Sequence, residues 1–594
     1  MTKQALDLKA KPKSATLEAW QALARRALGG TTDGVLGTRA DWPSADASGV
    51  PGAAPYTRGT NAARMRWDIR TVISESDPGR ANAQALEDIE GGATSLWIDI
   101  AAFGGRSDAL PAALNSLPLD RIAIALDRAD ANAARSALRL VDKPDLFLGI
   151  DDFAAAARGI SGSPADSAAL AREVSSLPGV RPISIDTRPY HNAGATPALE
   201  LGAALASGVA YLRVLTEAGI PIEAAVRQIA FILVTDTDVV RSTAKLRAFR
   251  RTWARVLNAC DAGDAMRDVH VTSISSELTM TKHDVYTNIL RTTLASFAGA
   301  IGGADAIALL PLDVRQGATS DDARRIARNT QSILLEEANI ARAIDPGGGA
   351  FAIERTSEEL AQASWREFQD IERLGGVAVV LSSGFLANRI SQEWQNRRSR
   401  IAARKEWITG ISDFPQLSEI AAAPATGALR FAPTGPRTGP LQRHHLDEEF
   451  EALRAASDEY LAGHGERPKI YLVSIGTEID AGTRVAFARS LFESGGIETV
   501  AGAPTLDAES AAAAFLDSGI ALAALCSSDA LYAEKSLGFA HEIARAGARG
   551  IYMIGAPGDL EASLRAAGVD EFVDEDVDAI ALLTRAYETL GVGS

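Results

Sequence analysis

The 594-residue chain is predicted to be an α/β protein, with a (β/α)8 barrel of the TIM type followed by a smaller, doubly wound α/β domain. Three observations predict this fold. Apolar runs of about four to eight residues alternate with Ala-rich helical stretches from about residue 65 to 410. The alternation stops between residues 412 and 468, and it restarts on a smaller scale at residue 469.

Residues 1–60 are expected to form an N-terminal arm. They combine one amphipathic helical stretch, residues 14–28, with a run rich in Gly, Pro, Ser and Asp over residues 29–60. Such a segment cannot bury a core of its own. Residues 1–30 also lack the continuous apolar region of a secretory signal.

Residues 61–411 are expected to form the barrel. Helices cover both faces of a parallel sheet, so the strands of such a sheet are continuously apolar. Seven or eight strand–helix units in a row predict a closed barrel. The predicted strands are residues 95–101, 121–126, 146–150, 182–186, 229–235, 270–274 and 304–310.

Residues 412–468 are expected to be a linker, and residues 469–594 the second domain. The linker combines a loose Pro/Gly-rich stretch at 421–440 with an acidic helix at 446–461. Five strands with helices between them then predict a flavodoxin-like, doubly wound domain. These strands are residues 469–475, 497–501, 521–526, 550–554 and 571–573, and the helices between them include 481–494 and 532–546.

Charge and composition exclude several classes of protein. The formal net charge of −16 argues against nucleic acid or an anionic membrane as the main partner. The most apolar stretch, residues 294–312, contains Asp305 and Pro311, so no membrane-spanning helix is expected. Cys260 and Cys526 match no C-x-x-C spacing, which excludes a disulfide scaffold and a structural zinc cluster and favours the cytoplasm.

Generic motifs add little. The sequence contains no Walker A loop, H-E-x-x-H, G-x-S-x-G or clean G-x-G-x-x-G. The adjacent His444 and His445 diverge on a helix by about 100°, so no metal site is predicted there. Residues 347–349, all glycine, favour a tight turn over a phosphate cradle. Three arginines close along one predicted helix favour helix pairing or a subunit contact over an oxyanion clamp: Arg324, Arg325 and Arg328.

Four long segments resemble the cobalamin-dependent acyl-CoA mutases of the methylmalonyl-CoA mutase family. They follow the family's order and spacing and are HNAGATPALELGAALASGVAYLR (191–213), HDVYTNILRTTLASFAGAIGGADAI (283–307), ARRIARNTQSILLEE (323–337) and IDPGGGAFAIERTSEELAQASWREFQDIERLGG (344–376). The resemblance implies a barrel whose axis admits acyl-CoA and a C-terminal domain of the type that binds adenosylcobalamin. It also implies the interconversion of (R)-methylmalonyl-CoA and succinyl-CoA by radical rearrangement.

The cofactor motifs of that family are degraded here. Active relatives carry a D-x-H-x-x-G turn whose histidine ligates cobalt. The equivalent turn is one residue shorter and has no histidine: Gly476, Thr477, Glu478, Ile479, Asp480, Ala481 and Gly482. The family's Ser-x-Leu segment places Asp529 where an apolar residue faces the nucleotide tail, and its Gly-Gly pair is Gly555-Ala556. The resemblance therefore predicts no cofactor and no metal on this chain.

The catalytic motifs of the barrel are degraded as well. Alignment on Trp67 places Ala62 where the family has a tyrosine over the reacting acyl group. The Tyr190-His191 pair is retained, but two residues are missing between it and the following Ala-Gly-Ala. If the sequence is aligned on Ala-Gly-Ala, Pro189 takes the place of the catalytic histidine. No catalytic residue is predicted, and His191 is either a remnant with a substrate role or a hydrogen-bonded structural histidine.

This pattern resembles the degenerate small chain of heterodimeric bacterial members of the family. The resemblance implies a catalytic large subunit as partner, which binds adenosylcobalamin and acyl-CoA, with the arm over residues 1–60 wrapping around it. One alternative is a cobalamin-independent acyl-CoA isomerase or lyase, or an acyl-CoA-binding protein, that uses the same barrel. Another is a scaffold for a cofactor-loading GTPase.

Overall fold

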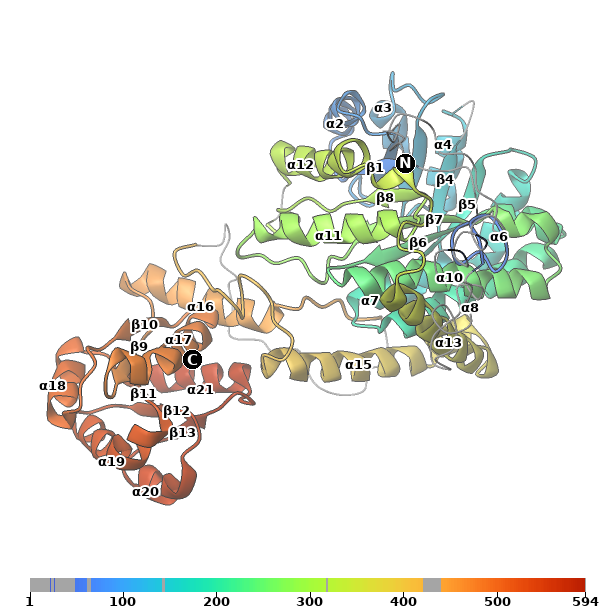
Figure 1. Cartoon of the computed structure of the whole chain (residues 1–594). Coiled ribbons are helices and arrows are strands. Elements are labelled where there is room, and N and C mark those ends of the chain that lie inside the picture. Colours follow the sequence, from blue (N-terminus) through green and yellow to red (C-terminus); the bar gives the residue numbers. More distant parts are fainter. Residues whose placement is uncertain are drawn as a thin grey trace, which may run out of the picture.

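A computed structural model describes residues 22, 26, 49–60, 66–141, 145–316, 319–419 and 440–592. Eight parallel strands close into a barrel in which each strand pairs with the next and β1 pairs with β8 (Figure 1). The predicted TIM-type barrel is thereby confirmed. The strands are β1 (Asp68–Ile73), β2 (Ser95–Asp99), β3 (Ala123–Asp127), β4 (Leu146–Ile150), β5 (Val180–Asp186), β6 (Ile229–Thr235), β7 (His270–Ser275) and β8 (Ala306–Ala308).

The first strand, β1, is absent from the predicted set because polar residues interrupt it. Its sequence, DIRTVI, places Arg70 and Thr71 between apolar residues, although both side chains are buried. The other seven strands coincide with predicted runs apart from their ends. Their apolar residues point both into the barrel and toward the outer helices.

Helices surround the barrel, and side-chain caps fix where several of them begin. Asp77 accepts a hydrogen bond from the backbone of Arg80 at the start of α2, and Thr196 caps α8 through the backbone of Leu199. The helices are α2 (Pro78–Glu90), α3 (Leu110–Ala113), α4 (Ala131–Leu138), α5 (Asp152–Ala157), α6 (Pro164–Glu173), α7 (Arg188–Asn192), α8 (Pro197–Glu217), α9 (Ile222–Arg227), α10 (Val239–Ala259), α11 (Thr287–Ile301), α12 (Asp321–Ser332), α13 (Phe351–Arg373), α14 (Val377–Ser382) and α15 (Phe385–Ala402).

Two of the three arginines of α12 pair this helix with α2, as predicted, whereas Arg325 pairs with Asp322 of α12 itself. Arg328 Nη1 lies 2.5 Å from Asp88 Oδ1 on α2, and Arg324 Nη1 lies 3.5 Å from the other oxygen of the same buried carboxylate. Gly349, with φ +85°, lies in the turn before α13, which confirms the tight turn.

One helix among the described residues, α8, is long and apolar enough to cross a membrane. Its most apolar window is 72% buried within the molecule. A core helix of a folded domain passes the same test of length and composition, so α8 gives little support to a membrane span.

The C-terminal part of the chain contains a five-stranded parallel sheet with the strand order β10-β9-β11-β12-β13. Alternate residues of the central strands enter two separate apolar clusters, one on each face, so helices cover both faces. The strands are β9 (Lys469–Ser474), β10 (Glu498–Ala501), β11 (Leu522–Cys526), β12 (Gly550–Ile554) and β13 (Glu571–Val573), and the helices are α16 (Glu448–His464), α17 (Glu478–Ser494), α18 (Ala508–Ser518), α19 (Asp529–Arg545), α20 (Glu561–Ala566) and α21 (Ala579–Leu590).

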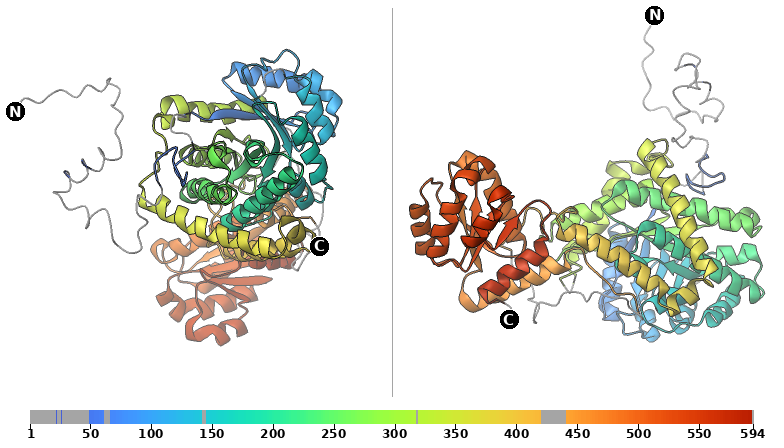
Figure 2. Two further views of the ribbon diagram at one scale, coloured as in Figure 1. Left: turned by 90° about the vertical axis from the view of Figure 1, so that its right-hand side faces the viewer. Right: turned by 90° about the horizontal axis from the view of Figure 1, so that it is seen from below.

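Two helices join the barrel to the C-terminal sheet. Ile401 at the end of α15 and Phe450 and Leu453 of α16 pack into the same core as the sheet. The predicted acidic helix is therefore α16, and it belongs to a packed core. Figure 2 shows the barrel end-on in one view and the C-terminal sheet with its helices as a separate lobe in the other. The position of the domain boundaries stays a prediction.

Candidate functional site

The interior of the barrel is filled by side chains. Arg70 donates hydrogen bonds to Ser95 Oγ at 2.8 Å and to Thr272 Oγ1 at 2.9 Å, and so links β1 to β2 and β7. Its guanidinium lies 4.7 Å from the centre of the Phe147 ring. Four large inward side chains are at most 7% exposed: Arg70, Trp97, Phe147 and His270.

A second layer of charged side chains lies nearer the carboxyl ends of the strands. The Arg188 guanidinium lies 4.8 Å from the Trp97 ring centre, and it donates to Asp127 Oδ2 at 3.1 Å and to Asp186 Oδ1 at 2.9 Å. Arg158 also pairs with Asp186. Burial opposes the charge on Asp186, but Arg188 and Arg158 outweigh it and hold its pKa well below the usual range.

An acyl chain threaded along the barrel axis would have to displace these groups. Removing a buried Trp or Phe side chain from a core costs on the order of 3–5 kcal/mol. Displacing Arg70 would in addition break its hydrogen bonds inside the core. The axis of this barrel therefore does not fit acyl-CoA.

A cavity of about 500 Å³ does lie at the carboxyl rim of β3 to β5, where TIM barrels place their active sites. Its charged lining is largely paired within itself, through the Arg158 and Arg188 contacts with Asp127 and Asp186. Burial raises the pKa of Asp151 to about 7, although its carboxylate accepts hydrogen bonds from the Ala154 and Asp186 backbone amides. These contacts cap α5 and join it to β5, which is a structural use of the carboxylate.

The structure places His191 in a buried network. Its Nε2 lies 2.7 Å from Ser276 Oγ, and its Nδ1 lies 3.3 Å from Glu200 Oε2. The same carboxylate accepts a hydrogen bond from Lys245 Nζ at 2.8 Å. Burial opposes the Glu200 charge, but Lys245 and His191 lower its pKa to about 2. Both ring nitrogens have protein partners, so this geometry matches the structural alternative for His191.

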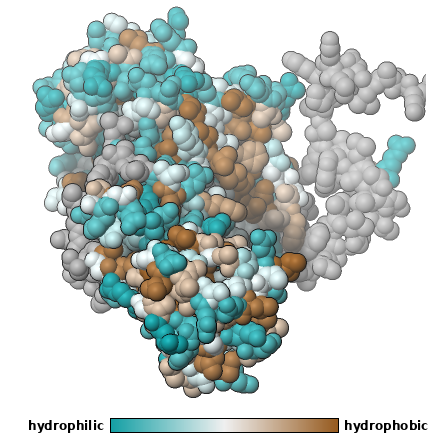
Figure 3. Space-filling model, turned by 90° about the vertical axis from the view of Figure 1, so that its left-hand side faces the viewer, coloured by the Kyte–Doolittle hydropathy of each residue, from teal (hydrophilic) through white to brown (hydrophobic). Residues whose placement is uncertain are grey.

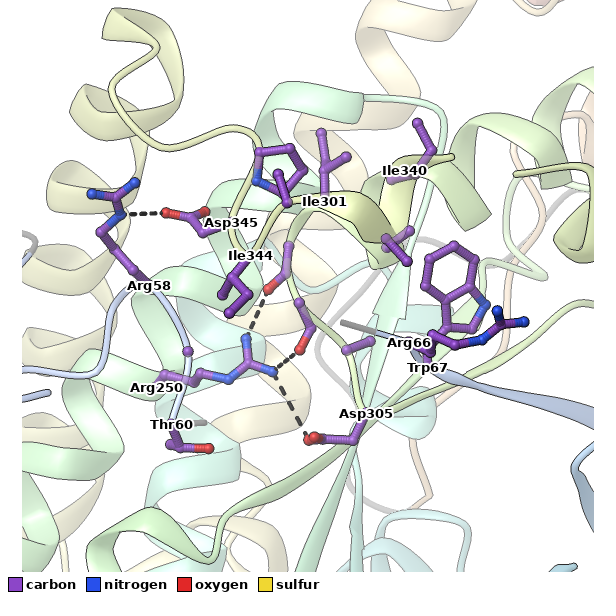
Figure 4. Close-up of a pocket in the computed structure, with 18 of the residues that line it drawn as sticks. Arg58, Thr60, Arg66, Trp67, Arg250, Ile301, Asp305, Ile340, Ile344 and Asp345 are labelled. Atoms are coloured by element: carbon purple, nitrogen blue, oxygen red, sulfur yellow. Dashed lines mark hydrogen bonds and ion pairs between the residues drawn. The ribbon is translucent and has the colours of Figure 1, made fainter. Parts of the chain in front are cut away.

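The segment around Trp67 borders a small cavity at the amino end of the barrel (Figure 4). Arg250 donates to the backbone carbonyl of Gly302 at 2.8 Å, and Arg58 donates to Asp345 at 2.7 Å. The cavity measures about 70 Å³, which is room for a few water molecules and not for a coenzyme. Ala62 lies outside the described residues.

The degenerate turn of the C-terminal domain lies between β9 and α17. Gly476 has φ +100°, and Thr477 and Asp480 form a reciprocal cap in which Asp480 Oδ2 accepts from the Thr477 backbone amide at 2.8 Å. Glu478 is the first residue of the helix, and Ile479 is 94% exposed. Among the described residues, no atom beyond its chain neighbours and the backbone of its own helix lies within 4 Å of the position that a Cβ would take on Gly482. The turn caps a helix and contains no imidazole that could ligate cobalt as the histidine of active relatives does.

Arg484 of α17 occupies the carboxyl edge of the C-terminal sheet. Its guanidinium pairs with the Ser527 carbonyl and with Asp529, and it lies 4.8 Å from the Tyr532 ring centre. A Cβ built on Gly555 would lie 2.8 Å from Arg484 Cζ. The segments that would hold a nucleotide tail therefore enclose an arginine. The only histidine after residue 469 is His541, on α19, so these residues do not fit cobalamin.

Within the described part of the chain, no group of three or more His, Cys, Asp or Glu side chains is arranged to hold a metal ion. His444 stacks on Trp394 with ring centres 4.3 Å apart, and its Nδ1 lies 3.0 Å from Glu448. His445 Nδ1 lies 3.3 Å from the carbonyl of Glu277.

A family model and the similar curated proteins agree on one family. A family model described as methylmalonyl-CoA mutase matches residues 166–426. The chain is 40% identical to a methylmalonyl-CoA mutase small subunit of Streptomyces virginiae, over 96% of this chain and 93% of that one. It is 34% identical to the small subunit of Propionibacterium freudenreichii subsp. shermanii, over 92% and 86% of the two chains. The methylmalonyl-CoA mutase large subunit of Streptomyces virginiae is 30% identical over 40% of this chain and 33% of that one.

Proposed function

Because the chain belongs to the methylmalonyl-CoA mutase small-subunit family, we propose that it is the non-catalytic subunit of a heterodimeric methylmalonyl-CoA mutase. In this proposal a large subunit carries adenosylcobalamin and acyl-CoA and interconverts (R)-methylmalonyl-CoA and succinyl-CoA. The complex acts in the bacterial cytoplasm.

The filled barrel axis is the observation that carries this proposal. Trp97 and Phe147 occupy the space that an acyl chain needs, and Arg70 is hydrogen-bonded beneath them. The same filling opposes a cobalamin-independent acyl-CoA enzyme that uses this barrel.

The C-terminal lobe supports the proposal independently. Its strand order, with β9 between β10 and β11, corresponds to the order 2-1-3-4-5 of flavodoxin-like sheets, so we assign it as a degenerate cobalamin-binding domain. The cofactor binds at the carboxyl edge of such a sheet, where Arg484 lies in this chain.

A degenerate copy is useful because association stabilises its partner. An obligate interface commonly buries 2,000 Å² or more in total, and a partner that binds only the folded form raises the apparent stability of that form by mass action. In the proposed complex this chain holds the large subunit in its folded, assembled form.

The proposal is tested with the purified chain, a purified large subunit and their mixture. We expect no corrin absorbance on the isolated chain after gel filtration with adenosylcobalamin, and no heat on titration with methylmalonyl-CoA. The mixture should give an active 1:1 complex. A corrin spectrum that co-elutes with the isolated chain, or micromolar binding of an acyl-CoA to it, would refute the proposal.

A further inference from the structure

The outer face of α11 is apolar and exposed. Tyr286, just before the helix, is 73% exposed, Leu290 is 63% exposed and Leu294 is 40% exposed. Their spacing of four residues places them on one side of the helix. Figure 3 views the molecule from the side toward which the start of α11 points, and hydrophobic residues gather there in a band on the barrel above the C-terminal lobe.

This face also carries no charge. Arg291 is the only charged residue of α11, and it is buried. Its Nη1 donates to Asn288 Oδ1 at 2.7 Å and its Nη2 donates to the Thr409 carbonyl at 2.6 Å, so the guanidinium points into the protein. An apolar surface depleted of charge is typical of the core of a protein–protein interface.

A rigid loop beside α11 presents two further aromatic side chains. Trp407 is 70% exposed and Phe414 is 74% exposed, whereas Ile411 and Ser412 between them are fully buried. Arg404 Nη2 donates to the Ser412 carbonyl at 2.9 Å and holds the loop in place. Phe414 has φ +53°, a strained conformation for an aromatic residue.

The loop and the helix form one connected surface. Arg291 joins α11 to the carbonyl of Thr409, and a Cβ on Gly410 would lie 2.0 Å from Asp284 Oδ2, two residues before Tyr286. Exposed aromatic residues on a rigid support are the usual anchors of an interface, because little conformational entropy is lost when they bind.

Size requires the two elements to act together. The outer face of the 15-residue helix is about 22 Å long and about 10 Å wide, or on the order of 220 Å². A stable interface needs about 800 Å² from each partner. The helix alone supplies about a quarter of that area, so neighbouring elements such as the 407–414 loop must contribute.

We propose that the outer face of α11 and the 407–414 loop form the docking surface for the large subunit, an inference that rests on the proposed function. The large subunit of a relative is itself 30% identical to part of this chain, so the two partners are homologous over that part. Homologous chains related by a pseudo-two-fold axis present the same patch to each other. An uncharged apolar helix face can pack against its counterpart, and the occupant is therefore the equivalent helix of the large subunit.

The test measures binding of the full-length chain to the large subunit by analytical ultracentrifugation. We expect the double variant Leu290→Asp/Leu294→Asp to bind at least 100-fold more weakly, and Trp407→Ala about tenfold more weakly, because each replaces a large apolar contact. The matched control is Leu516→Asp on α18, whose wild-type leucine is also 63% exposed and which should bind like the wild type. The circular dichroism of each variant should match the wild type, which separates a loss of binding from a loss of folding.

Binding of the double variant with unchanged affinity would overturn this surface and leave the proposed function intact. Failure of the wild-type chain to bind the large subunit would overturn the proposed function itself. A third outcome would overturn the assigned occupant. In it, the wild-type chain self-associates, the large subunit does not compete with this self-association, and the double variant abolishes it.

Discussion

Single residues decide whether this fold can hold a coenzyme. Trp97, Phe147 and Arg70 close the barrel axis, and Arg484 closes the carboxyl edge of the C-terminal sheet. Each of these side chains makes internal contacts that a ligand would have to replace. The side chains at these two positions are thus part of the packing of each lobe.

Trp97→Ala should lower the free energy of unfolding by about 3–5 kcal/mol, because it leaves a large cavity inside the barrel. Trp407→Ala is the matched control, since the Trp407 side chain is 70% exposed and its loss should change stability by no more than about 0.5 kcal/mol in the isolated chain. Urea unfolding followed by circular dichroism measures both. Equal effects of the two substitutions would contradict a filled barrel.

The residues that fill these spaces could not be identified from the sequence. Trp97 stands in a predicted apolar strand, but the sequence does not show which face of the strand points inward. Arg70 and Arg484 look like ordinary surface charges, because their buried partners come from distant segments, such as Thr272 and Ser527. The missing histidine of the 476–482 turn, by contrast, is visible in the sequence alone.

At the scale of elements, α16 is held to the barrel by a buried charge cluster. His283 Nδ1 lies 2.8 Å from Glu451 Oε1, and its Nε2 lies 3.7 Å from Asp458 Oδ2. On the same side, Arg315 Nη1 lies 2.6 Å from Asp447 Oδ1. Burial disfavours the His283 charge, but the neighbouring Asp458 and Glu451 carboxylates outweigh burial and raise the pKa of His283 above 6.5.

This cluster makes a prediction about pH. The raised pKa means that the stabilisation from His283 is complete below pH 6.5 and is lost as pH rises through the folded-state value. Asp447 acts in the same direction, because burial raises its pKa from 3.8 to about 7. His445 acts in the opposite direction, because burial and nearby Arg315 lower its pKa to about 3. The contribution of His283 is therefore measured as the difference in the free energy of unfolding between the wild type and a His283→Gln variant.

We expect that stability difference to shrink between pH 6 and pH 8 in urea unfolding. His541→Gln is the control, because the His541 side chain is 64% exposed and lies on α19, outside this cluster. A difference that grows with rising pH would contradict a charged His283 in the folded state.

The elements of both sheets were largely predictable, since strands buried on both faces are continuous apolar runs. The exception, β1, has a buried arginine that breaks the pattern. The acidic helix of the expected linker also differs in role. Its sequence looks solvated, yet Phe450 and Leu453 pack against the C-terminal sheet while Glu449 and Glu451 meet Arg398 and His283.

At the scale of the whole molecule, both lobes are well packed. Both retain apolar cores, and the barrel carries an exposed, uncharged helix face at α11. This combination fits the proposed role of the chain as a subunit that associates with a catalytic partner.

Addition of the large subunit should raise the midpoint of thermal unfolding of this chain, and more partner should raise it further. A partner present at about 100 times its dissociation constant adds about 2.7 kcal/mol to the apparent stability of the folded form. Differential scanning calorimetry at several ratios of the two chains measures the effect, with an unrelated protein of similar size as control. A midpoint independent of the large-subunit concentration would count against an obligate complex.

The number of cobalamins bound by the reconstituted 1:1 complex bears on the division of labour between the subunits. Corrin absorbance, divided by the protein concentration after gel filtration in excess adenosylcobalamin, gives that number. In this chain Arg484 closes the edge of the C-terminal sheet and the 476–482 turn lacks an imidazole. We therefore expect one cobalamin per heterodimer, bound by the large subunit. Two cobalamins per heterodimer would show that this chain binds the cofactor after all.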